Sequence, residues 1–252
     1  MTVLTNDTAI RPARRLEISW TEAGPFLALG ALLCVGYLVN PDFLSATNLS
    51  NVITRSAFIA IIAVGATFVI SAGGLDLSVG SMMAFVTGIM ILTMNRLEPS
   101  MGANAILISL AVAAIGAFIL YKTKYGRRCA AVGANEEVAR YAGISIVSTR
   151  TIAYLIQGVC VAIAAICYVP RLGAATPTTG MLWELQVITA VVIGGTALRG
   201  GKGRIWGTIA GAVILELIAN LMVLSDFVSE YLVAAVQGVI IIVAMLVQRF
   251  SK

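Results

Sequence analysis

Long apolar runs separated by short polar connections dominate the sequence. A membrane-crossing helix needs about 20 mostly apolar residues, and eight stretches approach or reach that length. They are Pro25–Val39 with an extension back toward Trp20, Val52–Ala72, Leu77–Met94, Ala103–Tyr121, Thr151–Val169, Leu185–Leu198, Ile205–Leu224 and Tyr231–Val247. Because the runs are continuous rather than alternating, they predict helices and not the strands of a barrel. The expected fold class is all-α, a polytopic membrane helix bundle of about eight spans.

Basic residues fall mostly on one side of these predicted spans. If the N-terminus is cytoplasmic and the spans alternate, 14 of the 17 Lys and Arg residues lie in cytoplasmic segments. The other three are Arg55, Arg96 and Arg171. Cytoplasmic loops carry the excess of Lys and Arg in membrane proteins. We therefore expect both termini inside, a cytoplasmic tail over 1–19, and one membrane domain over 20–252 with a long cytoplasmic connection over 122–150.

The composition agrees with a membrane protein. Of the 252 residues, 59% are hydrophobic and 12% are charged, and the mean hydropathy is +0.96. A soluble domain carries about 25% charged residues. Topology explains the net charge of +5 better than a nucleic-acid partner does. With no histidine and four scattered cysteines, we expect no Cys/His metal site, no catalytic constellation and no cofactor.

The cytoplasmic connection carries the signals of a short helix. Asn135 suits the N-cap, Glu136 begins an acidic first turn, Arg140 lies near the end and Gly143 follows it. Acid at the start, base at the end and glycine at C′ are typical of helix termini. We predict an amphipathic helix over Glu136–Ala142. From these residues alone it is either a solvated loop element or a docking element for a cytoplasmic partner.

A glycine-rich stretch, GGTALRGGKGR over Gly194–Arg204, invites comparison with a phosphate-binding loop. It fails the Walker pattern twice, because Thr196 stands where the first glycine belongs and the lysine is followed by glycine instead of Ser or Thr. It also joins two predicted spans rather than a strand and a helix. We expect Gly194 and Gly195 to interrupt a span or to pack closely, and Gly200–Arg204 to form a tight cytoplasmic turn.

One carboxylate, Asp76, follows the pair Gly73 and Gly74 between two apolar runs, in the stretch SAGGLDLSVG. A carboxylate at the bilayer centre costs ~3 kcal/mol on insertion scales, so its default role is functional. Near a span junction, however, Asp76 can be the N-cap of the next helix and accept from the amides near Ser78 and Val79. The residues favour this cap over direct chemistry. Contact with water or with a cavity stays open.

A second carboxylate, Glu216, lies in the middle of a predicted span. Asn220 is four residues further on, so the two side chains share one helix face. That face can line a polar path or form a helix contact. Gln157 and Gln237 are weaker cases of a polar residue at membrane depth.

Three blocks of sequence carry a resemblance to a known family. The first is Phe43-Leu44-Ser45 with Asn48-Leu49, followed by VISAGGLDLSVGS. The second is KTKYGRRCAAVGANEEVARYAGI, and the third is Glu184-Leu185 followed by ITAVVIGGTALRGGKGRIWGTIAGAVI. The blocks cover most of the chain outside the first 40 residues and about 95–110. Together they resemble the membrane subunit of bacterial monosaccharide importers of the ATP-binding-cassette (ABC) type, the ribose, xylose, arabinose and galactose permease family.

The resemblance implies a multi-pass permease of the bacterial cytoplasmic (inner) membrane. Its partners would be an ABC ATPase, an extracytoplasmic sugar-binding protein and a second permease copy, identical or different. The short cytoplasmic helix then corresponds to the coupling helix that docks the ATPase. The ATPase-coupling residues would be Gly126, Arg127, Gly133, Asn135, Glu136, Arg140 and Gly143. The candidate span-junction or path residues are Gly73, Gly74, Asp76, Ser78, Gly194, Gly195, Glu216 and Asn220.

The chain also departs from the family. Members usually exceed 300 residues, whereas here Met94 runs through NRLEPSMGAN almost directly into the span ahead of the cytoplasmic connection. The shortfall of about 60 residues equals two spans and a loop. Glu216 is unusual for its span, and Leu221 follows Asn220 where the family usually has glycine. The alternative to a working permease is therefore a shortened, transport-incompetent remnant or scaffold that still docks the ATPase.

Overall fold

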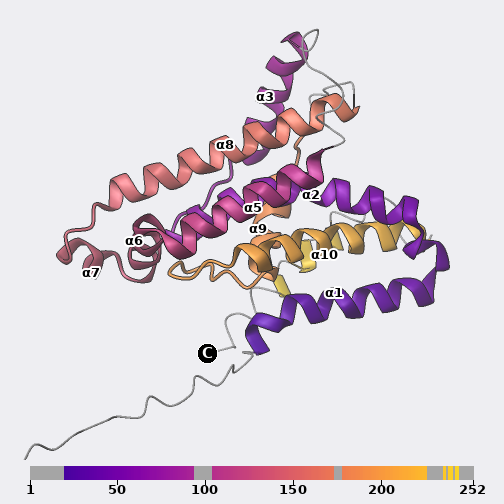
Figure 1. Ribbon diagram of the computed structural model, residues 1–252, viewed down its shortest axis with the longest axis horizontal. Coiled ribbons are helices and arrows are strands. Elements are labelled where there is room, and N and C mark those ends of the chain that lie inside the picture. The colour runs from indigo at the N-terminus through magenta and orange to yellow at the C-terminus, as the bar shows by residue number, and fades with distance from the viewer. Residues whose placement is uncertain are drawn as a thin grey trace, which may run out of the picture.

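The computed structural model describes residues 20–93, 104–172 and 178–225, together with seven positions between 235 and 243. These residues form helices and turns and contain no strand, as Figure 1 shows. The elements are α1 (Trp20–Val39), the 3₁₀ turn η1 (Pro41–Leu44), α2 (Ala46–Ser71), α3 (Val79–Thr93), α5 (Ala105–Lys122), α6 (Lys124–Ala134), α7 (Glu136–Tyr141), α8 (Ile146–Leu172), α9 (Trp183–Ile193) and α10 (Ile205–Leu224).

Within the described part, four helices are long and apolar enough to cross a membrane, namely α2, α5, α8 and α10. Shorter apolar helices occur in α1, α3 and α9. Seven of the eight predicted spans therefore correspond to helices. The eighth, Tyr231–Val247, lies mostly outside the described residues.

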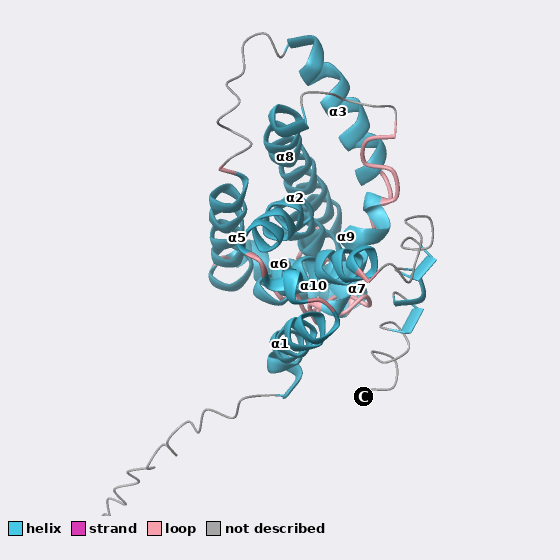
Figure 2. Ribbon diagram, turned by 90° about the vertical axis from the view of Figure 1, so that its right-hand side faces the viewer, coloured by secondary structure: helices cyan, strands magenta, loops and turns pink. Residues whose placement is uncertain are grey.

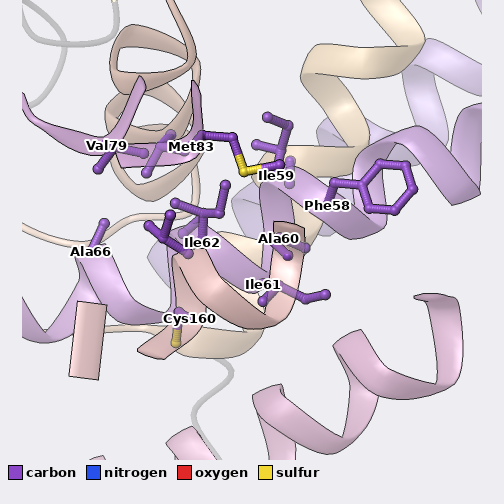
Figure 3. Packing of buried hydrophobic residues seen from close by; sticks show 14 of the residues in the cluster. Phe58, Ile59, Ala60, Ile61, Ile62, Ala66, Val79, Met83 and Cys160 are labelled. Carbon is purple, nitrogen blue, oxygen red and sulfur yellow. The ribbon is translucent and has the colours of Figure 1, made fainter. Parts of the chain in front are cut away.

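Helix α2 is the centre of the bundle. It packs against α5, α8, α9 and α10, and most of its length is buried, including Ile61, Ile62 and Ala63 with no exposed surface. The close view in Figure 3 shows Met83 of α3 and Cys160 of α8 packed around this stretch. A helix that is apolar on all sides is expected in the interior, and the unbroken run of Phe58–Ile70 has this pattern.

The chain reverses direction at the end of α2 through a glycine cap. The Gly73 amide donates to the Ile70 carbonyl and the Gly74 amide to the Val69 carbonyl, both at 2.9 Å. Gly73 has a φ of +75°, the left-handed conformation that this Schellman motif requires. The segment 74–78, which has no regular secondary structure, then leads to α3 at Val79. The prediction that the glycine pair ends this helix is confirmed.

A second interruption lies between α9 and α10. Helix α9 has 11 residues and is therefore about 16 Å long, roughly half of a membrane crossing. It ends at Gly194, where a Cβ would lie 2.4 Å from the Thr208 backbone nitrogen of α10. Gly195 follows with a φ of +84°. Gly194 thus follows the last residue of this short helix and packs closely against α10, and the interruption of a membrane span stays a prediction.

Several boundaries differ from the prediction. Helix α2 begins at Ala46, six residues early, because the hydroxyl of Ser45 caps the polar first turn. Helix α8 begins at Ile146 rather than at Thr151 for a similar reason, since the Ser145 hydroxyl accepts from the Ser148 amide. Helix α6 was missed because its 11 residues contain no long apolar run. Figure 2 shows α3 and α5 on opposite sides of α8 and α2.

Candidate functional site

The short helix that the sequence predicts on the cytoplasmic side is α7, and its caps agree with the sequence prediction. The Asn135 side chain accepts from the Val138 amide at 3.0 Å. At the other end, the amides of Gly143 and Ile144 donate to the carbonyls of Arg140 and Ala139, each at 3.0 Å, and Gly143 has a φ of +75°. These bonds form a second Schellman motif. The helix itself ends at Tyr141, with Ala142 as its C-cap.

Helix α6 attaches this loop to the bundle. The Tyr125 hydroxyl donates to the Thr149 carbonyl of α8 at 3.0 Å, and the Tyr125 ring stacks on Phe68 of α2. Burial raises the pKa of the Tyr125 hydroxyl and also the pKa of the Cys129 thiol. Tyr125 therefore keeps the proton that it donates. Gly126 is buried while Arg127 is exposed on the outer side of the helix.

Gly133 packs tightly against two other segments of the chain. A Cβ at this position would overlap the Ser71 carbonyl oxygen at the end of α2 and would lie 2.5 Å from the Gly201 amide nitrogen. Gly201 and its neighbour Gly200 both have a φ of +83°, and the Gly201 amide donates to the same Ser71 carbonyl at 3.0 Å. Three segments that are far apart in the sequence thus meet backbone to backbone.

Arg150 connects α7 to the end of α2. Its Nη2 donates to Glu136 Oε2 at 2.9 Å, and its Nε donates to the Ala72 carbonyl at 3.3 Å. Tyr154, one turn further along α8, donates its hydroxyl proton to the Leu75 carbonyl at 3.1 Å. The two groups of residues that the sequence singled out separately are therefore joined through α8. We name the whole arrangement of residues 71–78, 133–136, 150, 154 and 200–201 the inner junction.

Asp76 lies in the inner junction but is not the N-cap of α3, which corrects the prediction. Its Oδ1 accepts from the Ser78 amide at 2.9 Å and from the Ser78 hydroxyl at 2.6 Å. The helix begins only at Val79, so Ser78 holds the capping position. Asp76 stands two residues earlier and closes a turn of the kind that Asp favours. The predicted acceptor role is observed, at a position one turn outside the helix.

A polar and aromatic cavity of about 500 Å³ lies between α2, α8, α9 and α10. It is lined by charged and amide side chains and by the aromatic rings of Tyr168 and Trp183, which meet edge to face at 5.1 Å. We name it the outer cavity. Its lining residues are Asn51, Arg55, Phe58, Ile59, Tyr168, Arg171, Trp183, Gln186 and Glu216.

The arginine side chains of the outer cavity make long contacts with their partners. Arg55 Nη1 lies 3.8 Å from Glu216 Oε1, and the Arg55 side chain is 75% exposed. Arg171 donates to the Asn51 side chain at 3.4 Å. Asn220 does not line the cavity; its amide pairs with that of Asn48 in two 2.9 Å hydrogen bonds. Of the two residues on this predicted face, Glu216 therefore lines a polar space and Asn220 forms a helix contact.

Sequence reasoning missed most of the residues that connect or line these regions. Arg150 was one of the basic residues of the predicted cytoplasmic connection, and Tyr154 was an ordinary member of a predicted span. Arg55 and Arg171 were used only as minority cations in the topology count, yet both line one cavity. Gly80 is a further residue that the sequence did not single out. A Cβ at this position would lie 2.5 Å from the Gly180 carbonyl oxygen and would overlap the Glu184 carboxylate, so Gly80 allows a close contact with this segment.

Comparison with known proteins shows the relatives of the chain. A sequence profile of the family described as "Branched-chain amino acid transport system / permease component" matches residues 96–245. The ribose import permease protein RbsC of Haemophilus influenzae is 30% identical, with 91% of this chain and 93% of the relative covered. RbsC of Bacillus subtilis is 31% identical, with 90% and 92% covered. The L-arabinose transport system permease protein AraH of Escherichia coli is 37% identical over 145 residues, with 58% and 44% covered. No solved structure matches the chain.

The alignment with RbsC of Haemophilus influenzae also shows a difference in length between the two chains. It extends over 302 positions, while 91% of the 252 residues of this chain is about 229 residues, which leaves about 73 positions opposite gaps. Since nearly the whole of both chains is covered, these gaps lie inside the chain. The predicted internal shortening by about two spans is consistent with this difference.

Proposed function

The chain belongs to the permease family of ABC importers, and from this premise we propose that it passes a monosaccharide through the outer cavity under control of the inner junction. It is a membrane permease subunit and not an enzyme. The sugar class is inferred from relatives that are named ribose, allose and arabinose permeases. The observation that carries the proposal is the outer cavity, which combines polar and aromatic walls at the predicted extracytoplasmic side.

The lining of the outer cavity suits a sugar. Carboxylate, guanidinium and amide groups donate and accept hydrogen bonds to hydroxyls, while the rings of Tyr168 and Trp183 offer flat apolar faces to the C–H side of a pyranose. A volume of about 500 Å³ falls in the range of small-molecule sites. The exposed, 3.8 Å contact between Arg55 and Glu216 favours weak binding, which a path that must release its substrate requires.

The inner junction suits the coupling to a cytoplasmic ATPase. The α7 surface offers Val138 and Tyr141, which are 61% and 90% exposed, to a partner. Movement of α7 is carried by the Glu136–Arg150 contact to the backbone of Ala72 and thus to the start of the 74–78 segment. Two states of the ATPase can bias two states of the permease only through such differential contacts.

The remaining elements of the proposal concern the assembly. We propose that two permease copies form the path in the bacterial inner membrane, with the ABC ATPase on the α7 side and a sugar-binding protein on the side of Arg55 and Arg171. The observation in favour of this orientation is the distribution of basic residues.

Reconstituted transport tests the proposal. The full chain is placed in proteoliposomes with the ATPase and binding protein of its own source, and uptake of labelled ribose, allose and arabinose is measured with ATP inside. We expect uptake of one sugar that requires both partners and stops with a hydrolysis-deficient ATPase. Trp183→Leu should lower uptake about tenfold, whereas Phe85→Leu, at an exposed position of α3, should leave it within twofold.

The rival function is a scaffold that docks the ATPase without transport, and the internal shortening favours it. Co-purification of the ATPase without uptake of any of the sugars would support this rival and overturn the transport proposal. Absence of both co-purification and uptake would overturn the two together.

A further inference from the structure

A second cavity lies at the predicted cytoplasmic ends of α2, α5 and α10, apart from the outer cavity. Its volume is about 610 Å³, and Phe26 of α1 is one of its lining residues. The polar and aromatic lining residues are Phe26, Ser71, Tyr121, Lys202, Arg204 and Trp206, and the remaining ones are Leu, Ala or Gly. None of them is acidic. We name this space the basic cavity.

The chemistry of the basic cavity suits an anion. Lys202 and Arg204 contribute two cationic side chains, and no described carboxylate forms a salt bridge with Lys202. At the edge of the cavity, the Ser71 hydroxyl is buried and has no hydrogen-bond partner among the described residues. A side chain at position 203 would overlap this hydroxyl, so the glycine keeps it open. A buried hydroxyl without a partner is costly and calls for a ligand or water.

The other wall of the basic cavity is aromatic. Phe26, Tyr121 and Trp206 are each about half exposed, at 52%, 44% and 47%. The Tyr121 hydroxyl accepts from the Ile205 amide at 2.8 Å, which holds this ring at the helix ends. Aromatic residues gather where a membrane meets water. A basic pocket between helices on the cytoplasmic side is the setting in which anionic lipid head groups bind.

We propose that the basic cavity binds the phosphate of an anionic phospholipid, with the acyl chain lying along Phe26 and Trp206. Phosphate is the shared chemistry of a lipid and of a free anion, and the aromatic wall at the membrane boundary selects the lipid. The proposal uses the predicted orientation but does not depend on sugar transport, because neither the outer cavity nor α7 takes part in it.

Quenching of Trp206 by brominated lipid tests the proposal. The chain has three tryptophans, so Trp20→Phe with Trp183→Phe leaves Trp206 as the single fluorophore. This double variant is reconstituted into vesicles in which brominated phosphatidylglycerol or brominated phosphatidylcholine is mixed with unbrominated phosphatidylcholine. We expect brominated phosphatidylglycerol to be preferred over brominated phosphatidylcholine at Trp206 by about tenfold or more, because each basic residue near a membrane surface contributes about fivefold.

The matched variants separate a built site from general attraction. Lys202→Gln should lower the preference about fivefold. Lys124→Gln removes a cation from the same face of the protein but not from the cavity lining, and should change the preference less than twofold. Arg204→Gln provides a second variant, and elution as a single species in detergent shows that each variant is folded.

Three outcomes would overturn the proposal. A preference that is absent, or that falls equally in Lys202→Gln and Lys124→Gln, would mean diffuse attraction to the membrane surface. Loss of the preference in millimolar inorganic phosphate, with sodium chloride as the ionic-strength control, would assign the site to a free anion. Loss on addition of the ATPase would identify the cavity as a protein contact. Retention of the preference under both additions, together with the Lys202 effect, would support the lipid site.

Discussion

The inner junction and the outer cavity each contain an arginine–glutamate pair, and the two pairs differ. Arg150 lies 2.9 Å from Glu136, is 34% exposed and also donates to a backbone carbonyl. Arg55 lies 3.8 Å from Glu216 and is 75% exposed. The first pair has the geometry that transmits displacement between helices, and the second the geometry of a weak, hydrated contact. Coupling requires rigid contacts, whereas passage of a substrate requires contacts that are readily exchanged.

The largest effect is expected at the backbone contact of the inner junction. Gly133→Ala places a methyl group against the Ser71 carbonyl and the Gly201 amide, and overpacking of this kind costs about 1–3 kcal/mol or more. We expect a lower thermal midpoint of the protein in detergent and loss of ATPase co-purification. Gly30→Ala, with nothing within 4 Å, should be neutral or stabilising by up to about 1 kcal/mol. Equal behaviour of the two variants would remove the claim of a tight junction.

The arginine of the inner junction comes next. Arg150→Gln breaks the contact with Glu136 and the bond to the Ala72 carbonyl, and we expect ATP-dependent uptake to fall about tenfold while the ATPase still binds. The control is Arg128→Gln, which removes an exposed cation of the same loop that forms no salt bridge with a described carboxylate. Its effect should be within twofold. If the two variants lower uptake by the same factor, uptake depends on the positive charge of this loop and not on the contacts of Arg150 with Glu136 and Ala72.

A smaller effect on stability is expected at the turn that Asp76 closes in the inner junction. Asp76→Asn keeps a side-chain oxygen for the Ser78 amide, whereas Asp76→Leu removes it, and losing such a bond at a helix start costs about 1 kcal/mol. Thermal midpoints in detergent should therefore separate the two variants, with Asn near the wild type. Should both variants abolish uptake equally, the negative charge itself would be required, contrary to the turn-closing role.

The smallest effect is expected for the ion pair of the outer cavity. A double-mutant cycle with Arg55→Gln and Glu216→Gln, read by thermal unfolding, should give a coupling energy below about 1 kcal/mol, because the two charges are 3.8 Å apart and the Arg55 side chain is 75% exposed, although Glu216 is only 21% exposed. The single variants should mainly change the sugar concentration at half-maximal uptake. A coupling energy of several kcal/mol would show that the Arg55–Glu216 pair is a strong contact, and the difference between this pair and the Arg150–Glu136 pair would not hold.

Local signals in the chain predicted the individual elements well. The apolar runs placed seven helices, and the caps of α7 followed from Asn135 and Gly143 because capping depends on residues within one turn of each other. The glycine pair after α2 was predictable for the same reason. Helix α6 was missed since an 11-residue surface helix lacks a long apolar run, and Asp76 was placed one turn too close to α3.

By itself the sequence determined the membrane class, the apolar helices, the caps of α7 and the family, because these depend on composition, on neighbours along the chain and on motif spacing. Only the tertiary structure decided which polar residues meet. Arg150 reaches Ala72 across 78 positions of sequence, and Gly133 touches both Ser71 and Gly201. Arg55 and Glu216 come to line one cavity from α2 and α10. Such contacts depend on how helices of separate segments pack, and no periodicity within one segment encodes the partner that it will face.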